Sequence, residues 1–276
     1  MTMNAGAPVR VVVTGKGGVG KTTLTALLAR EWARRGERVL AVDADEQMNL
    51  ARTLGLTAGA AAAITPLSHE RDYIEETVGA RPGAGGSMLR LNPDVSDAVA
   101  RFGVDGPDGV RLLVMGGLSQ AGAGCLCPEN SLITAAVAAV GRDHADVVLM
   151  DTHAGVEHFG RALARGFDHA VVVTDPTANA VGVAVRSARL AAELGIPRVT
   201  LVVNRVRGPG DVDRVSRLVA GQGGFPFHAV RAVPWDEAVL DADPSVEPLL
   251  DVETPFTRAT RELADDWSPA TMEVAR

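Results

Sequence analysis

The sequence is poor in cysteine and has no long apolar run. Only two cysteines occur among 276 residues, and they are two positions apart, which excludes the disulfide framework of a small secreted domain. No apolar stretch approaches the roughly 20 residues that a membrane-spanning helix needs. Residues 1–8 also lack the apolar core of a signal peptide. These absences predict a cytoplasmic protein.

Basic charge is also in deficit, because the formal net charge is -7. A general nucleic-acid or anionic-membrane surface needs clustered cations, so neither is favoured, although a local basic patch stays open. The balance of 46% hydrophobic and 22% charged residues is that of an ordinary globular protein. No internal repeat is present. We therefore predict one large domain over residues 1–276.

A phosphate-binding loop is the most informative feature that the chain does contain. The segment Thr14–Thr23 reads TGKGGVGKTT and matches the pattern G-x-x-x-x-G-K-[ST]. A β-branched run at 9–13 precedes it, and a helical pattern follows it. Backbone N–H groups of such a loop, together with a helix N-terminus, surround phosphate oxygens. The residues expected to bind nucleotide are Gly15, Gly17, Gly18, Val19, Gly20, Lys21, Thr22 and Thr23. Of these, Lys21 is expected to reach the β- and γ-phosphates of ATP, and Thr22 to bind Mg²⁺.

Apolar runs alternate with helical patterns along the rest of the chain. The runs predict strands at 38–42, 111–115, 146–150, 169–174 and 197–203, with helices such as 131–140 and 181–194 between them. This alternation is typical of an α/β fold, a P-loop NTPase with a mostly parallel sheet and helices on both faces. Residues 57–110 are rich in Ala and Gly and predict a variable insertion, with a helix at 70–78 and a mobile stretch after it.

Acidic residues follow two of the predicted strands, at the sheet edge where ligands bind. We expect Asp151 to be a catalytic partner of Mg²⁺ through water, and Asp45 to orient or deprotonate the attacking water. Gly155 would leave room for the γ-phosphate. The alternative is that these aspartates cap helices.

Lys16 adds a second lysine to the loop, and GKGGVGKTT resembles the deviant Walker A motif of the ParA, MinD, nitrogenase iron protein and ArsA group of dimeric ATPases. The resemblance implies a homodimer in which the catalytic Lys16 crosses to the partner's ATP. It also implies that Asp45 lies in switch I and residues 151–155 in switch II. Two later segments resemble the base-contacting segments of that group, and the residues concerned are Asn204, Arg205, Pro234, Trp235 and Asp236.

Cys125 and Cys127 form a C-x-C pair, which is half of a tetrahedral thiolate metal site. A twofold axis could supply the other half from a second chain. Two free thiols in a tight turn, or a strained redox disulfide, are the alternatives.

The segment G-C-x-C-P-x-N, with A-G-V-E-H-F-G-R at 154–161, resembles the nickel-insertion ATPases of carbon monoxide dehydrogenase maturation, the CooC family. The resemblance implies that Cys125 and Cys127 bind Ni²⁺ or Zn²⁺ across the dimer. It also implies that Glu157, His158 and Arg161 report the nucleotide state, with His158 as a metal ligand or as a helix-face contact. The client would be a metalloenzyme such as carbon monoxide dehydrogenase.

Two departures from that family concern the client more than the ATPase. His153 stands where the family has an acidic residue, and residues 162–165 differ from its usual Gly-Thr. Two other classes compete with the metallochaperone ATPase. A positioning or partitioning ATPase of the ParA or MinD type needs a basic patch or a basic membrane helix, whereas carboxylates outnumber arginine at 261–268. An electron-transfer ATPase could hold an iron–sulfur cluster on four cysteines per dimer, but those relatives space their cysteines far apart.

Overall fold

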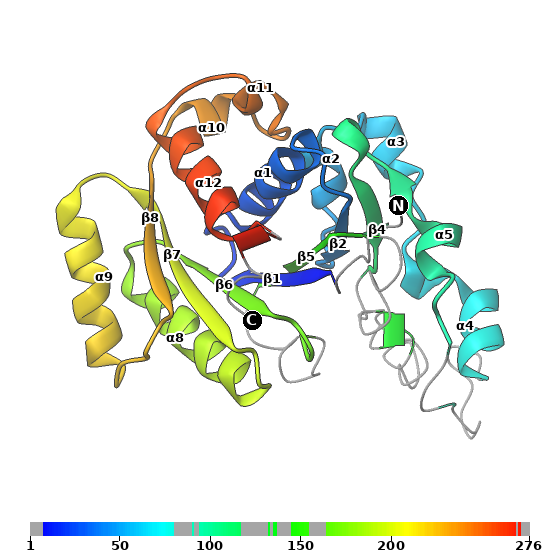
Figure 1. The fold of residues 1–276 in the computed structure, drawn as a ribbon, viewed down its shortest axis with the longest axis horizontal. Coiled ribbons are helices and arrows are strands. Elements are labelled where there is room, and N and C mark those ends of the chain that lie inside the picture. The colour runs from blue at the N-terminus through cyan, green and yellow to red at the C-terminus, as the bar shows by residue number, and fades with distance from the viewer. Residues whose placement is uncertain are drawn as a thin grey trace.

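One mostly parallel sheet organises the chain (Figure 1). The computed structural model describes residues 8–79, 90, 94–116, 132, 135–136, 145–154, 164–268 and 270–271. Within these residues eight strands lie in the order β3-β4-β2-β5-β1-β6-β7-β8. Every neighbouring pair is parallel except β3 and β4, which are antiparallel. The strands are β1 (Val9–Gly15), β2 (Val39–Ala44), β3 (Val104–Asp105), β4 (Arg111–Val114), β5 (Val147–Thr152), β6 (His169–Thr174), β7 (Arg198–Val206) and β8 (Ala229–Pro234).

Helices cover both faces of the sheet (Figure 1). The described helices are α1 (Lys21–Arg34), α2 (Leu50–Leu54), α3 (Ala58–Ala62), α4 (Arg71–Val78), α5 (Ala98–Phe102), α8 (Ala178–Glu193), α9 (Pro209–Gly221), α10 (Ala238–Asp241), α11 (Glu247–Leu250) and α12 (Pro255–Asp266). In Figure 1, α1, α10, α11 and α12 lie on one side of the sheet, and α8 lies on the other. This two-faced covering explains why the central strands are apolar throughout rather than alternating.

Strand alternation divides the core into two layers. Side chains of successive strand residues point to opposite faces, so Val11 and Val13 of β1 pack in the layer that contains α1, whereas Val12 packs in the layer that contains α8. All three are fully buried. The β-branched run of β1 therefore contributes to both layers and places the end of the strand at the centre of the molecule.

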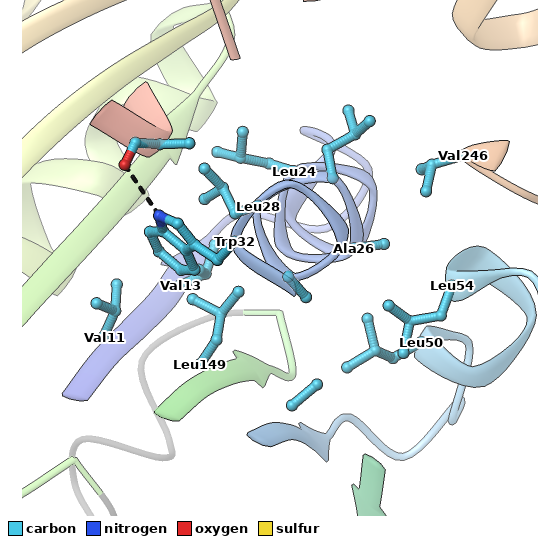
Figure 2. Packing of buried hydrophobic residues seen from close by; sticks show 14 of the residues in the cluster. Val11, Val13, Leu24, Ala26, Leu28, Trp32, Leu50, Leu54, Leu149 and Val246 are labelled. Carbon is cyan, nitrogen blue, oxygen red and sulfur yellow. Dashed lines mark hydrogen bonds between the residues drawn. The ribbon is translucent and has the colours of Figure 1, made fainter. Parts of the chain in front are cut away.

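Helix α1 is held firmly against the sheet. Its residues Leu24, Leu28 and Trp32 recur at helical spacing and face the sheet, as Figure 2 shows. The Trp32 indole Nε1 donates a hydrogen bond to the carbonyl of Ala264 in α12, at 2.9 Å. Because Trp32 is fully buried, this bond satisfies its N–H group and fixes α12 on α1. The phosphate-binding loop, which leads into the first turn of α1, is thus anchored to a firmly packed helix.

Most strands predicted from the sequence occur within two or three residues of the predicted bounds, and β6 matches the predicted bounds 169–174. The predicted helix at 70–78 is α4, and the predicted helix at 181–194 is α8. Two strands were missed. β8 contains an exposed arginine that interrupts its apolar pattern, and β3 has only two residues.

The region 57–110 contains more regular structure than predicted. It holds α3, α4 and α5, and its strand β3 joins the sheet beside β4. The part expected to be mobile, and most of the helix predicted at 131–140, lie outside the described residues. The domain boundaries and the insertion at 57–110 stay predictions.

Candidate functional site

The phosphate-binding loop lies between β1 and α1, as the sequence predicts. Gly15 has φ 147°, and a Cβ added there would lie 2.1 Å from the carbonyl oxygen of Val173 in β6. Gly20 has φ 96°, and a Cβ there would lie 2.5 Å from Nδ2 of Asn204. Only glycine fits these two positions, because the backbone conformation and the close neighbours both exclude a side chain. Gly20 is the N-cap of α1, so the free N–H groups of the helix point to the loop.

Lys21 is buried at the start of α1. Its Nζ donates a hydrogen bond to the carbonyl of Lys16 at 3.4 Å, which curls the lysine back across the loop. Burial lowers the pKa of Lys21, while the charges of Asp151 and Asp45 act in the opposite direction. The ammonium group is therefore enclosed near two carboxyl groups. Its positive charge can offset the negative charge of a phosphate bound in the loop.

Asp151 lies near the end of β5, beside the start of α1. Its Oδ2 accepts a hydrogen bond from the Thr22 hydroxyl at 2.6 Å, and the residue is fully buried. Burial raises the pKa of Asp151 to about 7, although Thr22 and Lys21 hold it down. Its other oxygen, Oδ1, is buried without a hydrogen-bond partner among the described residues. A threonine hydroxyl beside a carboxylate with an unused oxygen is the oxygen donor set that Mg²⁺ takes together with phosphate and water.

Asp43 is a functional candidate that the sequence analysis did not identify. It is fully buried, and its two oxygens accept hydrogen bonds from the backbone N–H groups of Asp45 and Leu50, each at 3.0 Å. Burial and the nearby charge of Asp151 raise the pKa of Asp43 to about 8. The Asp-x-Asp spacing at the end of β2 is the signal that could have identified it. Asp43 ties together the two ends of the loop that carries Asp45.

A cavity opens above the loop. It is lined by Gly17, Gly18, Gly20, Lys21, Thr22, Thr23, Asp45, Gln47, Asn49, His153, Ala154 and Arg205. The structure thus brings Asp45 together with the phosphate-binding loop, as expected. Gln47, Asn49 and His153 are additions that the site prediction did not include. Lys16 is exposed and is not among the lining residues, and Asp151 lies buried behind Thr22.

A second cavity adjoins the first and shares Gly20, Thr23 and Arg205 with it. Its other lining residues are Leu24, Val202, Asn204, Val233, Pro234, Trp235, Asp236, Val239, Leu240 and Phe256. All five residues expected at the base therefore meet in one place. The apolar lining from α1, α10 and α12 was missed, because these residues are far apart in the sequence. A flat apolar cavity with a few polar groups suits a nucleobase.

Asn204 lines the second cavity and links the end of β7 to the phosphate-binding loop. Its Nδ2 donates to the carbonyl of Val19 at 2.8 Å, and its Oδ1 accepts from the N–H of Arg205, also at 2.8 Å. Arg205 adopts φ 60°, which is uncommon for a residue with a side chain. Trp235 lies under the guanidinium of Arg207, at 4.7 Å from ring centroid to Cζ. The side chain of Val19 is buried and lines neither cavity. Val19 contributes only its backbone carbonyl, which accepts the hydrogen bond from Asn204.

Several expected residues lie outside the part of the chain that the structure describes. These are Cys125, Cys127, Gly155, Glu157, His158 and Arg161. Among the described residues, no group of three or more His, Cys, Asp or Glu side chains could hold a metal ion. Within the same residues, none of the helices is both long enough and apolar enough to cross a lipid bilayer.

The loop between β1 and α1 is that of a P-loop ATPase, and the Thr22–Asp151 pair and the two cavities lie beside it. The chain belongs to the CobQ/CobB/MinD/ParA nucleotide binding domain family, whose model matches residues 10–249. Among curated proteins it is 36% identical over 238 residues to the carbon monoxide dehydrogenase accessory protein CooC of Rhodospirillum rubrum, covering 85% of this chain and 86% of that protein. It is 35% identical over 234 residues to an uncharacterized ATP-binding protein of Methanocaldococcus jannaschii, covering 85% and 88% of the two chains.

Solved structures support the fold. The septum site-determining protein MinD from Pyrococcus horikoshii OT3, complexed with Mg-ADP, superimposes with a TM-score of 0.64 at 18% identity. The match covers 95% of this chain and 96% of that chain. At this identity the likeness concerns the fold alone. Together the comparisons confirm the predicted P-loop ATPase with a mostly parallel sheet, and its relation to CooC.

Proposed function

We propose that this ATPase is a maturation factor that loads a divalent metal, nickel or zinc, into a client enzyme in the cytoplasm. The observation that carries the proposal is the 36% identity to the CooC accessory protein across most of both chains. The sequence G-C-x-C-P-x-N around Cys125 and Cys127 supports it, since two thiolates suit both metals. A carbon monoxide dehydrogenase or a similar metalloenzyme is the proposed client.

The nucleotide site supports ATP hydrolysis by positioning and electrostatics. Lys21 offsets the charge of the β- and γ-phosphates, and the N–H groups at the start of α1 bind their oxygens. Asp45 lines the same cavity and orients the water that attacks the γ-phosphorus. Thr22 and Asp151 would hold Mg²⁺, Asp151 through water, and the metal would neutralise charge that develops on the phosphates. Asn204, Arg205 and the segment 234–236 contact the base.

Dimer formation is part of the proposal. Lys16 is exposed beside the phosphate cavity, a position from which a lysine can reach a partner's nucleotide. Two chains facing each other across this loop would also supply two C-x-C pairs, and four thiolates complete a tetrahedral site. ATP binding would close the dimer and form the metal site, and hydrolysis would open it to release the metal.

The decisive experiment measures metal content and oligomeric mass under anaerobic conditions, with and without ATP. Wild type should hold about one metal ion per two chains. Cys125→Ser and Cys127→Ser should each lose the metal and keep nucleotide binding. Lys16→Ala is the second test variant: it leaves both thiolates in place but removes the residue proposed to cross the interface, so it should bind nucleotide and lose the ATP-dependent dimer. Wild-type protein without cysteine-dependent metal would contradict the proposal.

A positioning switch of the MinD or ParA type is the competing function, and the family match includes both names. The C-terminal helix α12 argues against a membrane role for that element. Its apolar side chains Phe256, Leu263 and Ala264 are buried in the core beside Trp32, so they are not free to enter a lipid surface. A dimer that forms on ATP without metal would favour this second function.

A further inference from the structure

His153 is the one departure from the CooC pattern that lies inside the described nucleotide site. It follows β5 and lines the phosphate cavity together with Lys21 and Asp45. The functions assigned so far leave this half-buried imidazole without a role. An imidazole carries at least one N–H donor in either protonation state, so it can bind an anion.

The residues on either side of His153 hold it beside the phosphate-binding loop. Two residues earlier, within β5, Oδ2 of Asp151 accepts a hydrogen bond from the Thr22 hydroxyl at the start of α1. Between them, the Thr152 hydroxyl donates to the carbonyl of Val13 at 2.8 Å, which ties the end of β5 to β1. On the other side, a Cβ added to Gly17 would lie 3.3 Å from Cβ of Ala154. His153 is therefore held between two residues that contact β1 and its loop.

The order of the strands determines which part of the nucleotide His153 can reach. The base cavity is built from the ends of β7 and β8, and the phosphate-binding loop follows β1. From β8 the sheet continues through β7, β6, β1, β5 and β2. A nucleotide with its base at β7 and β8 and its first phosphates on the loop thus extends its terminal phosphate toward β5 and β2. His153 follows β5 and Asp45 follows β2.

Charge at this end of the site calls for a donor. Asp45 follows β2 and lines the phosphate cavity, whereas Asp43 and Asp151 are buried near the ends of β2 and β5. A γ-phosphate at this edge therefore meets the carboxylate of Asp45. Lys21 faces that phosphate from the loop side. A hydrogen bond donor on the strand side offsets the repulsion.

We propose that His153 donates a hydrogen bond to the γ-phosphate of ATP and is a specificity-determining residue that distinguishes ATP from ADP. The inference rests on the proposed nucleotide site. It concerns an interaction that exists only with the triphosphate, so ADP binding is independent of it.

Titration calorimetry with the β,γ-imido analogue of ATP and with ADP, both with Mg²⁺, tests the proposal. His153→Ala should weaken the analogue by about tenfold or more, the loss typical of a hydrogen bond to a charged group, and leave ADP affinity unchanged. His153→Gln keeps an N–H donor and should restore part of the affinity. His153→Glu introduces the acidic side chain typical of the related family and should bind the analogue more weakly than His153→Ala, because like charges repel.

His69→Ala is the matched control, since His69 is an exposed histidine that lines neither cavity. It should bind both nucleotides as wild type does. Equal affinities in His153→Ala and wild type, or an equal loss for the analogue and ADP, would overturn the assignment of His153 alone. Wild-type protein that binds neither nucleotide would overturn the nucleotide site, and the role of His153 with it.

Discussion

Strands β2 and β5 lie side by side, and the pKa values of the acidic residues at their two ends are shifted in opposite directions. Before the strands begin, Arg38 donates from Nη2 to Oδ1 of Asp146 at 2.5 Å, and this pairing lowers the pKa of Asp146. Where the strands end, Asp43 and Asp151 face each other in register and are fully buried. Burial raises the pKa of these carboxyls to about 8 and about 7. The first edge pairs its charges near the surface, whereas the second buries two adjacent carboxyl groups beside the phosphate-binding loop.

The largest expected effect comes from removing the cation that faces the buried carboxylates. Lys21→Ala leaves Asp151 and Asp45 without their nearby ammonium group, so nothing at this position offsets the repulsion between the carboxylates and the phosphates. We expect no calorimetric binding of Mg-ATP at concentrations up to about 1 mM, a binding free energy weaker than about -4 kcal/mol. Unchanged affinity would contradict the assignment of the phosphate-binding loop.

The exposed lysine of the same loop should behave differently. Lys16→Ala should retain ATP binding but lose turnover by about a thousandfold, the low end of the effect of a cation supplied by a partner chain to a phosphoryl transfer. Steady-state phosphate release, measured beside ATP affinity and oligomeric mass, checks this. Full activity of the variant would disprove a role for Lys16 across the dimer.

A pair of isosteric substitutions compares the two edges directly. Asp151→Asn should lower ATP turnover by roughly 10- to 100-fold, because it weakens the Mg²⁺ partner. It should also raise Tm, because it removes one of two adjacent buried carboxylates. Asp146→Asn should leave turnover unchanged and lower Tm slightly, since surface ion pairs contribute less than about 1 kcal/mol. A fall in Tm for Asp151→Asn would mean that the buried carboxylate stabilises the fold.

A further difference between the two edges concerns His169, which begins β6 at the edge away from the phosphate-binding loop. The residue is fully buried, its Nε2 lies 2.9 Å from Oγ1 of Thr200, and burial lowers its pKa from 6.5 to about 3. The unfolded chain therefore binds the proton more readily. The stability contribution is complete above about pH 6.5 and is lost as the pH falls toward 3.

Between pH 7 and pH 5 this loss should be about 2 kcal/mol of unfolding free energy. Urea denaturation of wild type and His169→Gln at both pH values measures this loss. The readout is the difference between the two proteins in how the free energy of unfolding changes with pH. The comparison with His169→Gln is needed because Asp43 and Asp151 have raised pKa values, and their contribution to the free energy of unfolding increases as the pH falls. An equal change with pH in both proteins would contradict burial of a neutral imidazole at His169.

Local sequence patterns were sufficient for much of the fold and for the phosphate half of the site. Residues 15–23 span the connection from β1 into α1, and Thr22 meets Asp151 because β1 and β5 are parallel neighbours whose carboxyl ends lie at the same edge of the sheet. The base half could be named only through resemblance. Asn204 is 185 residues from the Val19 carbonyl that it contacts, and no periodicity within a segment reveals such a distance.

The sequence by itself determined the chemistry of this protein: the loop that binds phosphate, the threonine and aspartate that suit Mg²⁺, the C-x-C pair and the alternation of strands and helices. These depend on residue type and short spacing, because backbone conformation and side-chain periodicity are local properties. Only the tertiary structure decided that Asp43 is buried with two N–H partners, that α10 and α12 complete the second cavity, and that His153 lines the cavity above the phosphate-binding loop. Burial and cavity lining arise from packing between distant segments, which no single segment encodes.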